Sequence, residues 1–166
     1  LAFDSRSTDF RAGIGGLEGR RLAKGDCLMF GTPACEAIRP WGRPFPLSAR
    51  PLYLANSILR VILGPQADRF SSRAIERLFS SPYVMSPDSD RMGFRLDGAP
   101  ILPGRPGQLI SDATAAGTIQ VPADRRPILL MADCQTTGGY PKIASVMSVD
   151  MAQAGQLAPG DRVRFI

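Results

Sequence analysis

The sequence contains no histidine and only two lysines, Lys24 and Lys142, among its 166 residues. Without histidine the chain cannot supply a Ser-His or Cys-His nucleophile system, and a zinc site of the usual kind is hard to assemble. The three cysteines include no C-x-x-C pair, and an odd number cannot all pair within one chain, so we interpret them as free thiols. These shortages exclude many hydrolase mechanisms, and no metal site is predicted.

Long apolar runs are also missing. No run approaches the roughly 20 residues that a membrane span needs, and the N-terminus has neither the basic start nor the apolar core of a signal peptide. We therefore expect a cytoplasmic location and no membrane contact. The chain begins at Leu1 without methionine, which we interpret as a part of a longer protein.

Charge of one sign is not concentrated anywhere. The net charge of +5 could favour nucleic acid, because clustered lysine and arginine neutralise phosphates. However, residues 1–50 carry eight basic and five acidic side chains, and residues 51–166 carry twelve and ten. Neither part forms a block of one sign, so no nucleic-acid partner is predicted.

The first third of the chain is rich in turn residues. Glycines at 13, 15, 16 and 19 precede a turn at Gly25-Asp26, and Cys27 to Phe30 reads as a short apolar strand. The segment from Gly31 to Pro51 holds five prolines, too many for a helix or a central strand. We expect it to be an extended connector.

The remainder of the chain predicts a mainly β fold with one or two short helices. Ser71 or Ser72 can cap a helix over Arg73 to Phe79, and Asp97-Gly98 is a hairpin signal. Short strands are expected at Ile58 to Leu63, Tyr83 to Met85, Met92 to Leu96, Leu109-Ile110, Thr118 to Val121, Ile128 to Met131, Ile143 to Val149 and Val163 to Ile166. So many short strands favour a closed barrel or a sandwich, in which every sheet edge finds a partner.

A polar loop follows one of these strands, from Asp133 to Lys142. Gly138 and Gly139 let backbone N–H groups approach a ligand closely. The other side chains of the loop that can hydrogen-bond a carboxylate or an amide are Gln135, Thr136, Thr137 and Tyr140. The alternative interpretation is a hairpin turn with solvated hydroxyls.

Two further segments carry polar groups at suggestive positions. Arg91 and Arg95 lie four residues apart in a predicted strand, so both guanidinium groups can hold one carboxylate or phosphate. Alternatively, they form structural ion pairs with Asp88, Asp90 or Asp97. Gln120, between two apolar residues, is either an edge polar group or a side chain that faces a site.

The chain resembles the C-terminal half of a known bacterial family, allophanate hydrolase subunit 2. The motifs that carry the resemblance are SRSTD, GIGGLEGR, SDRMGFRL, GTIQVP, DCQTTGGYPKIA and APGDRVRF, in this order over essentially the whole chain. Related members are the carboxyltransferase region of urea carboxylase, the C subunit of 5-oxoprolinase and KipA-type regulators. One departure is Cys134, where the family usually has arginine.

The resemblance implies a fold and a domain division. Members of the family are similar in having tandem cyclophilin-like closed β-barrels. Residues 1–50 would then be the tail of a preceding barrel subdomain plus the proline-rich connector, and residues 51–166 the C-terminal cyclophilin-like barrel subdomain. The N-terminal half of the family is missing from this sequence.

The resemblance also implies an activity on an amide or lactam nitrogen, as in urea carboxylation or ATP-dependent opening of 5-oxoproline. Site roles follow as hypotheses: Lys142 or Tyr140 handles a proton, Asp133 acts as base or orients one of them, and Arg91 anchors an anion. Hydrogen-bond donors to the substrate would be Gln120, Gln135, Thr136, Thr137, Gly138 and Gly139.

No biotinylation lysine or Walker-type loop is present, so biotin or ATP would arrive on a partner. The implied partners are a subunit 1-type (KipI-like) protein, the missing N-terminal half and a small amide or lactam substrate. The alternative is a regulatory protein of the KipA type, which binds a kinase inhibitor and performs no chemistry.

Overall fold

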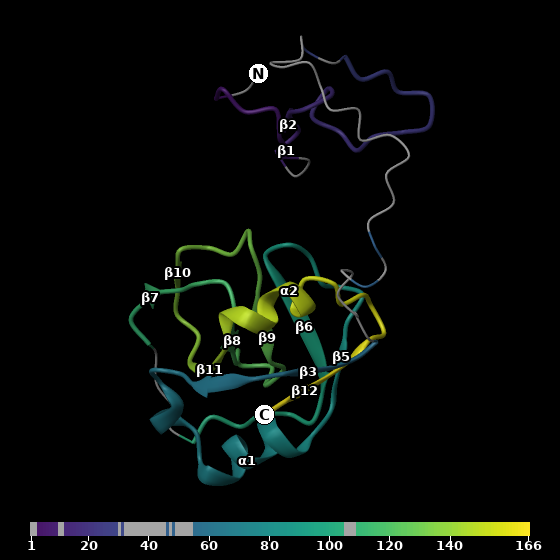
Figure 1. The fold of residues 1–166 in the computed structure, drawn as a ribbon. Coiled ribbons are helices and arrows are strands. Elements are labelled where there is room, and N and C mark those ends of the chain that lie inside the picture. The colour runs from purple at the N-terminus through teal and green to yellow at the C-terminus, as the bar shows by residue number, and fades with distance from the viewer. Residues whose placement is uncertain are drawn as a thin grey trace. The chain divides into compact units, whose positions relative to one another are not determined.

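The chain divides into two compact units, Leu1–Arg50 and Pro51–Ile166 (Figure 1). A computed structural model of the protein describes residues 3–9, 12–29, 31, 46, 48, 55–104 and 109–166. The predicted connector between Gly31 and Pro51 therefore lies almost entirely outside the described residues. Among the described residues, no helix has the length and apolar character to cross a membrane.

The first unit is held by short turns. Strands β1 (Thr8–Asp9) and β2 (Ile14–Gly15) pair antiparallel. Gly19 adopts a positive φ of +66° where a side chain would collide with the backbone of residue 13, so only glycine fits there. The predicted strand from Cys27 to Phe30 is wrong for its described part, residues 27–29, which form no strand. Residues 27–29 pair with no described strand, and an apolar composition alone does not supply a pairing partner.

The second unit is built on one eight-stranded sheet. Its strand order is β3-β12-β5-β6-β9-β8-β11-β4, and every neighbouring pair is antiparallel except β3 with β12. The bounds are β3 Asn56–Leu59, β4 Val61–Leu63, β5 Tyr83–Met85, β6 Gly93–Gly98, β8 Thr118–Gln120, β9 Ile128–Leu130, β11 Lys142–Val146 and β12 Arg162–Phe165. A separate ribbon joins β7 (Asp112–Ala113) to β10 (Thr137–Gly138).

The two edge strands of the large sheet, β3 and β4, are consecutive in the chain and separated only by Arg60. One extended segment therefore pairs with β12 through its first half and with β11 through its second half. Val61 N–H donates to the Ile166 carbonyl at 2.8 Å, and Ile166 N–H donates to the Leu59 carbonyl at 3.1 Å. The sheet curls into a barrel in this way, which confirms the predicted mainly β, cyclophilin-like barrel class.

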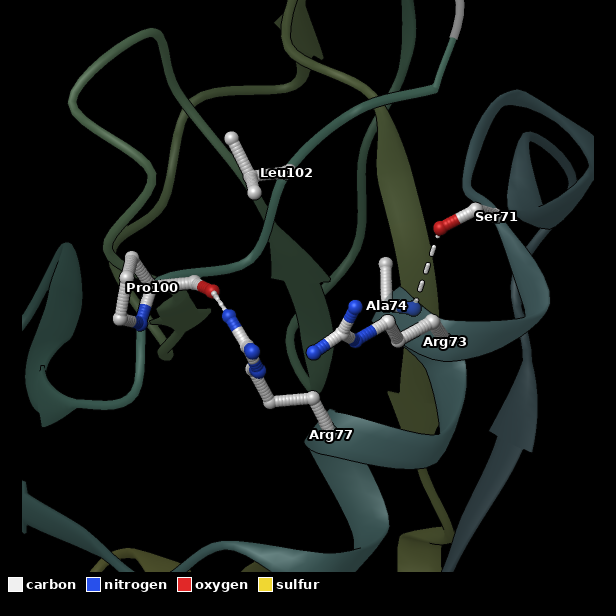
Figure 2. Close-up of a pocket in the computed structure, with 6 residues that line it drawn as sticks. All are labelled: Ser71, Arg73, Ala74, Arg77, Pro100 and Leu102. Atoms are coloured by element: carbon white, nitrogen blue, oxygen red, sulfur yellow. Dashed lines mark hydrogen bonds between the residues drawn. The ribbon is translucent and has the colours of Figure 1, made fainter.

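Helices are few and short, as predicted. Helix α1 (Ser72–Ser80) covers one end of the barrel and buries Ala74 and Leu78, while α2 (Met151–Ala154) follows the 3-10 turn η3 (Ser148–Asp150). The predicted cap is confirmed: the Ser71 hydroxyl accepts from Ala74 N–H at 3.2 Å (Figure 2). Another 3-10 turn, η2 (Ala67–Arg69), precedes the helix.

Most predicted strands are present, with two corrections. Leu109-Ile110 is not a strand; the chain pairs three residues later, in β7. Asp97-Gly98 is not a hairpin turn but the end of β6, where Gly98 lies opposite Tyr83 in β5. A side chain at Gly98 would approach the Tyr83 ring within 2.7 Å. The glycine there serves packing rather than chain reversal.

Alternation along the strands builds the core. β3 and β12 each alternate exposed and buried residues, so one face of each strand points into the barrel. The largest side chains that are almost fully buried are Leu59, Leu78, Tyr83, Leu96, Ile101, Ile119, Gln120, Val121, Leu129, Ile143, Val163 and Phe165. Gln120 is the one polar amide in this set.

A clasp of two residues holds the segment at the point where it leaves β3 for β4. The buried carboxylate of Asp150 accepts from Arg60 N–H at 2.8 Å, from Nε at 2.9 Å and from a terminal guanidinium nitrogen at 2.6 Å. The Arg60 carbonyl accepts from Met147 N–H at 2.9 Å. Asp150 therefore satisfies the backbone and the side chain of the same residue.

Replacement of Asp150 by alanine should destabilise the barrel. We expect a loss of about 2 kcal/mol in the free energy of unfolding, because the change leaves the buried N–H of Arg60 without an acceptor. Urea denaturation measures this loss. Asp88→Ala, at an exposed position, is the matched control and should stay within about 0.5 kcal/mol of wild type. Equal values for the two variants would contradict the clasp.

The same clasp predicts a pH dependence. The hydrogen bond from Arg60 lowers the pKa of Asp150 below its ordinary value. Because its pKa is lower in the folded state, ionised Asp150 contributes its full stabilisation above about pH 4, the ordinary pKa of the unfolded carboxyl. This contribution is lost as the pH falls through the folded pKa. Asp150→Asn should therefore flatten the loss of stability between neutral and strongly acidic pH. An unchanged pH profile in the variant would contradict this assignment.

Candidate functional site

Lys142 begins strand β11 and is buried, with 4% of its surface exposed. A lysine is rarely so buried unless its charge is paired. Its Nζ donates to Asp112 Oδ2 at 2.8 Å and to the Ala113 carbonyl at 2.6 Å, both on β7. The hydrogen bond from Lys142 also lowers the pKa of Asp112, which keeps that carboxylate ionised. The result is a fixed ion pair between the barrel and the ribbon.

The backbone around Lys142 is fixed by the segment that closes the barrel. Lys142 N–H donates to Gln66 Oε1 at 3.2 Å, and Gly64 N–H donates to the Ile143 carbonyl at 2.8 Å. A side chain at Gly64 would collide with the carbonyl of Lys142, so glycine permits this close approach. The pairing of β11 with β8 shifts register between Lys142 and Ala144, and this bulge sets the direction of the lysine.

Gln120 lies opposite Lys142 in the register of β8 with β11. It is 1% exposed, and its Nε2 has no hydrogen-bond partner. An unpaired buried amide lowers the stability of the folded state by about 1–3 kcal/mol, because it has lost its hydrogen bonds to water. Among the described residues, only the Tyr83 hydroxyl shares this condition.

The glycine loop approaches this unpaired amide. A Cβ built on Gly138 would lie 2.8 Å from Gln120 Nε2 and 3.4 Å from Gln135 Nε2. Only a residue without a side chain leaves that space open. The amide nitrogens of Gln120 and Gln135 therefore both lie close to the space that a side chain at Gly138 would fill.

Two residues of the loop, Thr137 and Gly138, form strand β10, which pairs with β7 as a two-stranded ribbon (Figure 1). Thr137 lies opposite Ala113, and Gly138 lies opposite Asp112. Thr114 N–H donates to the Thr136 carbonyl at 2.9 Å, and the Thr114 hydroxyl donates to the Gln135 carbonyl. The ribbon thus joins the ion pair, the glycine and the amides into one cluster.

The predicted site residues fall into two groups. Lys142 forms the ion pair, Gln120 lies opposite it in the strand register, and Gly138 lies close to the amides of Gln120 and Gln135. The residues of the loop that are exposed are Gln135, Thr136, Thr137, Gly139 and Tyr140. The roles predicted for all of them remain hypotheses.

Asp133, the first residue of the loop, binds Arg91, which lies just before β6. Arg91 Nε and a terminal nitrogen donate to the two Asp133 oxygens at 2.6 and 2.9 Å, and Asp133 N–H donates to the Arg91 carbonyl. Arg91 also lowers the pKa of Asp133. The side chains are 78% and 50% exposed, so this pair is superficial. The acidic partner of Arg91 is therefore Asp133, and not Asp88, Asp90 or Asp97, which the sequence had suggested.

Sequence reasoning missed two members of the cluster, Asp112 and Gln66. Asp112 is thirty residues from Lys142 and Gln66 seventy-six, and neither stands in a recognisable motif. An acidic partner for a buried lysine could have been sought, but its position follows only from the ribbon. Among the described residues, no three side chains of the His, Cys, Asp or Glu type gather where they could hold a metal ion.

Comparison with known proteins agrees with the motifs. The chain is 37% identical to the C subunit of 5-oxoprolinase from Escherichia coli over 162 residues, which cover 98% of this chain and 50% of that protein. The corresponding protein of Haemophilus influenzae is 35% identical, with 99% and 50% covered. The crystal structure of Kluyveromyces lactis urea carboxylase matches with a TM-score of 0.78 and 27% identity, covering 98% of this chain and 16% of that one.

The chain spans about half the length of these 5-oxoprolinase subunits. The family described as "carboxyltransferase domain, subdomain A and B" matches residues 1–166. The predicted resemblance is thereby confirmed, and the chain belongs to this carboxyltransferase-domain family.

Proposed function

We propose that this chain forms part of an enzyme that acts on an amide or lactam nitrogen, by carboxylation of urea or by ATP-dependent opening of 5-oxoproline. The observation that carries the proposal is the unpaired, buried amide of Gln120 beside Gly138 and the buried ammonium of Lys142. Support also comes from the relatives, which are a subunit of 5-oxoprolinase and a urea carboxylase.

The cluster suits a reaction that builds negative charge on oxygen. When an amide nitrogen attacks or leaves a carbonyl carbon, the carbonyl oxygen gains charge, and fixed N–H donors stabilise it best in a dry site. Gln120 Nε2 offers such a donor without first breaking a hydrogen bond. Lys142 adds a positive charge, and its ammonium has three N–H groups, of which two are directed at Asp112 and Ala113.

Proton transfer requires a group that can gain and lose a proton. We assign it to Lys142 or to Tyr140, whose exposed phenol lies two residues before Lys142. Asp112, which contacts Lys142 directly, takes the orienting role that the sequence suggested for Asp133. Asp133 is held by Arg91 at the outer end of the loop, and this pair fixes where the loop begins.

Biotin or ATP would be supplied by a partner. The Gln120 amide, which has no partner, would donate to the carbonyl oxygen of a ureido ring, and carboxybiotin would provide the carboxyl group to be transferred. The proposed partners are a subunit 1-type (KipI-like) protein and the remaining half of the carboxyltransferase. A cytoplasmic location completes the proposal.

Lys142→Met should abolish turnover. The change removes the charge and keeps most of the length, and we expect a loss of at least about a hundredfold in kcat, in line with other electrostatic groups in active sites. The measurement is glutamate formation from 5-oxoproline and ATP, or urea carboxylation. It uses the longest natural chain that contains this sequence, purified with its partner subunit. Lys24→Met, at the exposed second lysine, is the matched control and should retain full activity.

Gln135→Ala separates catalysis from regulation in the same preparation. Lost turnover with unchanged binding of the partner subunit supports a catalytic loop. If Lys142→Met and Gln135→Ala reduce partner binding as much as they reduce turnover, the loop is an interface. The KipA-type regulator then becomes the better explanation.

Gln120→Leu should separate function from stability. Removal of an unpaired buried amide in favour of an apolar side chain of similar size should keep or raise the free energy of unfolding, by up to about 1 kcal/mol, while turnover falls. Urea denaturation and the activity assay measure the two effects. Gln156→Leu, at an exposed position, is the control. A Gln120→Leu protein that keeps full activity would show that the amide takes no part in turnover.

A further inference from the structure

A groove lies on the outer wall of the barrel, away from the cluster around Lys142. It has a volume of about 380 Å³ and is lined by Asn56, Ser57, Ile58, Pro82, Arg162 and Arg164. Strand β12, which forms its floor with β3, is separated from β8 by three strands on one path around the sheet, β5, β6 and β9. The groove lies on the outer face of β3 and β12, where its lining residues Asn56, Ile58, Arg162 and Arg164 are exposed. Gln120 and Lys142, in contrast, are buried and belong to β8 and β11.

The floor of the groove is a regular grid of side chains. β3 and β12 are parallel, with Asn56 opposite Arg162 and Ile58 opposite Arg164. All four side chains point outward, because both strands alternate exposed and buried residues in the same phase. Residues two apart on one face of a strand are about 7 Å apart. Both arginines are thus presented in one direction, beside an amide and an exposed isoleucine.

The charge of this grid is not compensated within the described part of the chain. Elsewhere in the barrel, Arg60, Arg91 and Arg126 each have an aspartate oxygen within 2.8 Å. The described residues that line the groove include no carboxylate, and no ion pair joins Arg162 or Arg164 to another described residue. Two adjacent cations without a counter-charge favour an acidic ligand, since guanidinium groups bind carboxylates through paired hydrogen bonds.

We propose that this groove binds an extended acidic segment of a partner protein. In an extended chain, carboxylates at alternate positions lie on one side with the same spacing of about 7 Å. Such a segment can place one carboxylate on Arg162 and the next on Arg164. Asn56 offers its amide to the backbone or to a carboxylate, and Ile58, 55% exposed, gives an apolar contact at the centre. Because β12 already pairs with β3 and β5, the acidic segment of the partner cannot add as a further strand. It lies on the outer face of the sheet, along β12.

The test uses two fluorescent peptides of the same composition. In one, glutamate and serine alternate; in the other, the glutamates form one block. We expect the alternating peptide to bind the full chain more tightly, and Arg162→Gln with Arg164→Gln to weaken it about tenfold. The matched control is Arg73→Gln with Arg95→Gln, which removes the same charge at exposed positions outside the groove. Fluorescence anisotropy measures both affinities.

Equal weakening by the two double variants would mean general charge attraction and would overturn the proposal, as would equal affinity for the two peptides. Tighter binding of a single-stranded oligonucleotide through the same arginines would also overturn it in favour of nucleic acid. Ile58→Glu provides a second variant that keeps both arginines. It places a carboxylate in the groove and should weaken the alternating peptide, whereas unchanged affinity would contradict the assigned location.

Discussion

The barrel depends on one constraint: a single extended segment, residues 56–63, must form both edges of the sheet. Arg60 lies where this segment changes partner from β12 to β11, and the buried carboxylate of Asp150 binds its backbone and its guanidinium together. Without such a clasp, each edge would present unpaired backbone groups to solvent. The closed sheet in turn encloses Leu59, Phe165 and Ile143, which come from three of the strands that meet at this seam.

The same segment continues from the seam to the candidate site. After β4 it turns at Gly64, whose missing side chain permits contact with the Lys142 carbonyl, and the Gln66 side chain then accepts from Lys142 N–H. The closure of the barrel and the position of the buried lysine are therefore two ends of one stretch of about ten residues. On its other side, Lys142 holds the β7 and β10 ribbon through Asp112, so the ammonium connects the rigid wall to the glycine loop.

The sequence predicted local features well and distant ones poorly. Short apolar runs between turn residues located β5 and β12 almost to the residue, and the serine before residues at helical spacing located α1. These signals depend on neighbours within one turn or one strand. The break of β3 from β4 at Arg60 was not predicted, since its cause is an aspartate ninety residues away. Asp97-Gly98 misled for the related reason that a packing glycine and a turn glycine look alike in sequence.

Within the candidate site, residue types predicted the loop and Gln120 but not the contacts that these side chains make. The partner of Arg91, Asp133, lies forty-two residues away, and the partner of Lys142 lies on a two-residue strand that no pattern marks. Burial could not be predicted from the sequence either. Lys142 and Tyr140 are two residues apart in the same loop, yet Lys142 is buried and Tyr140 is half exposed. Only the register of β11 with β8 decides which of them faces Gln120.

Native-state hydrogen exchange of three amides tests most directly whether closure and site are one unit. The amides of Val61 and Ile166 report on the seam, because they donate to the Ile166 and Leu59 carbonyls. The Lys142 amide reports on the site, because it donates to Gln66 Oε1. The account predicts that all three exchange with the same free energy, equal to that of global unfolding. Rapid exchange of the Lys142 amide through local opening, with Val61 and Ile166 still protected, would show that the site is not supported by the closure of the barrel.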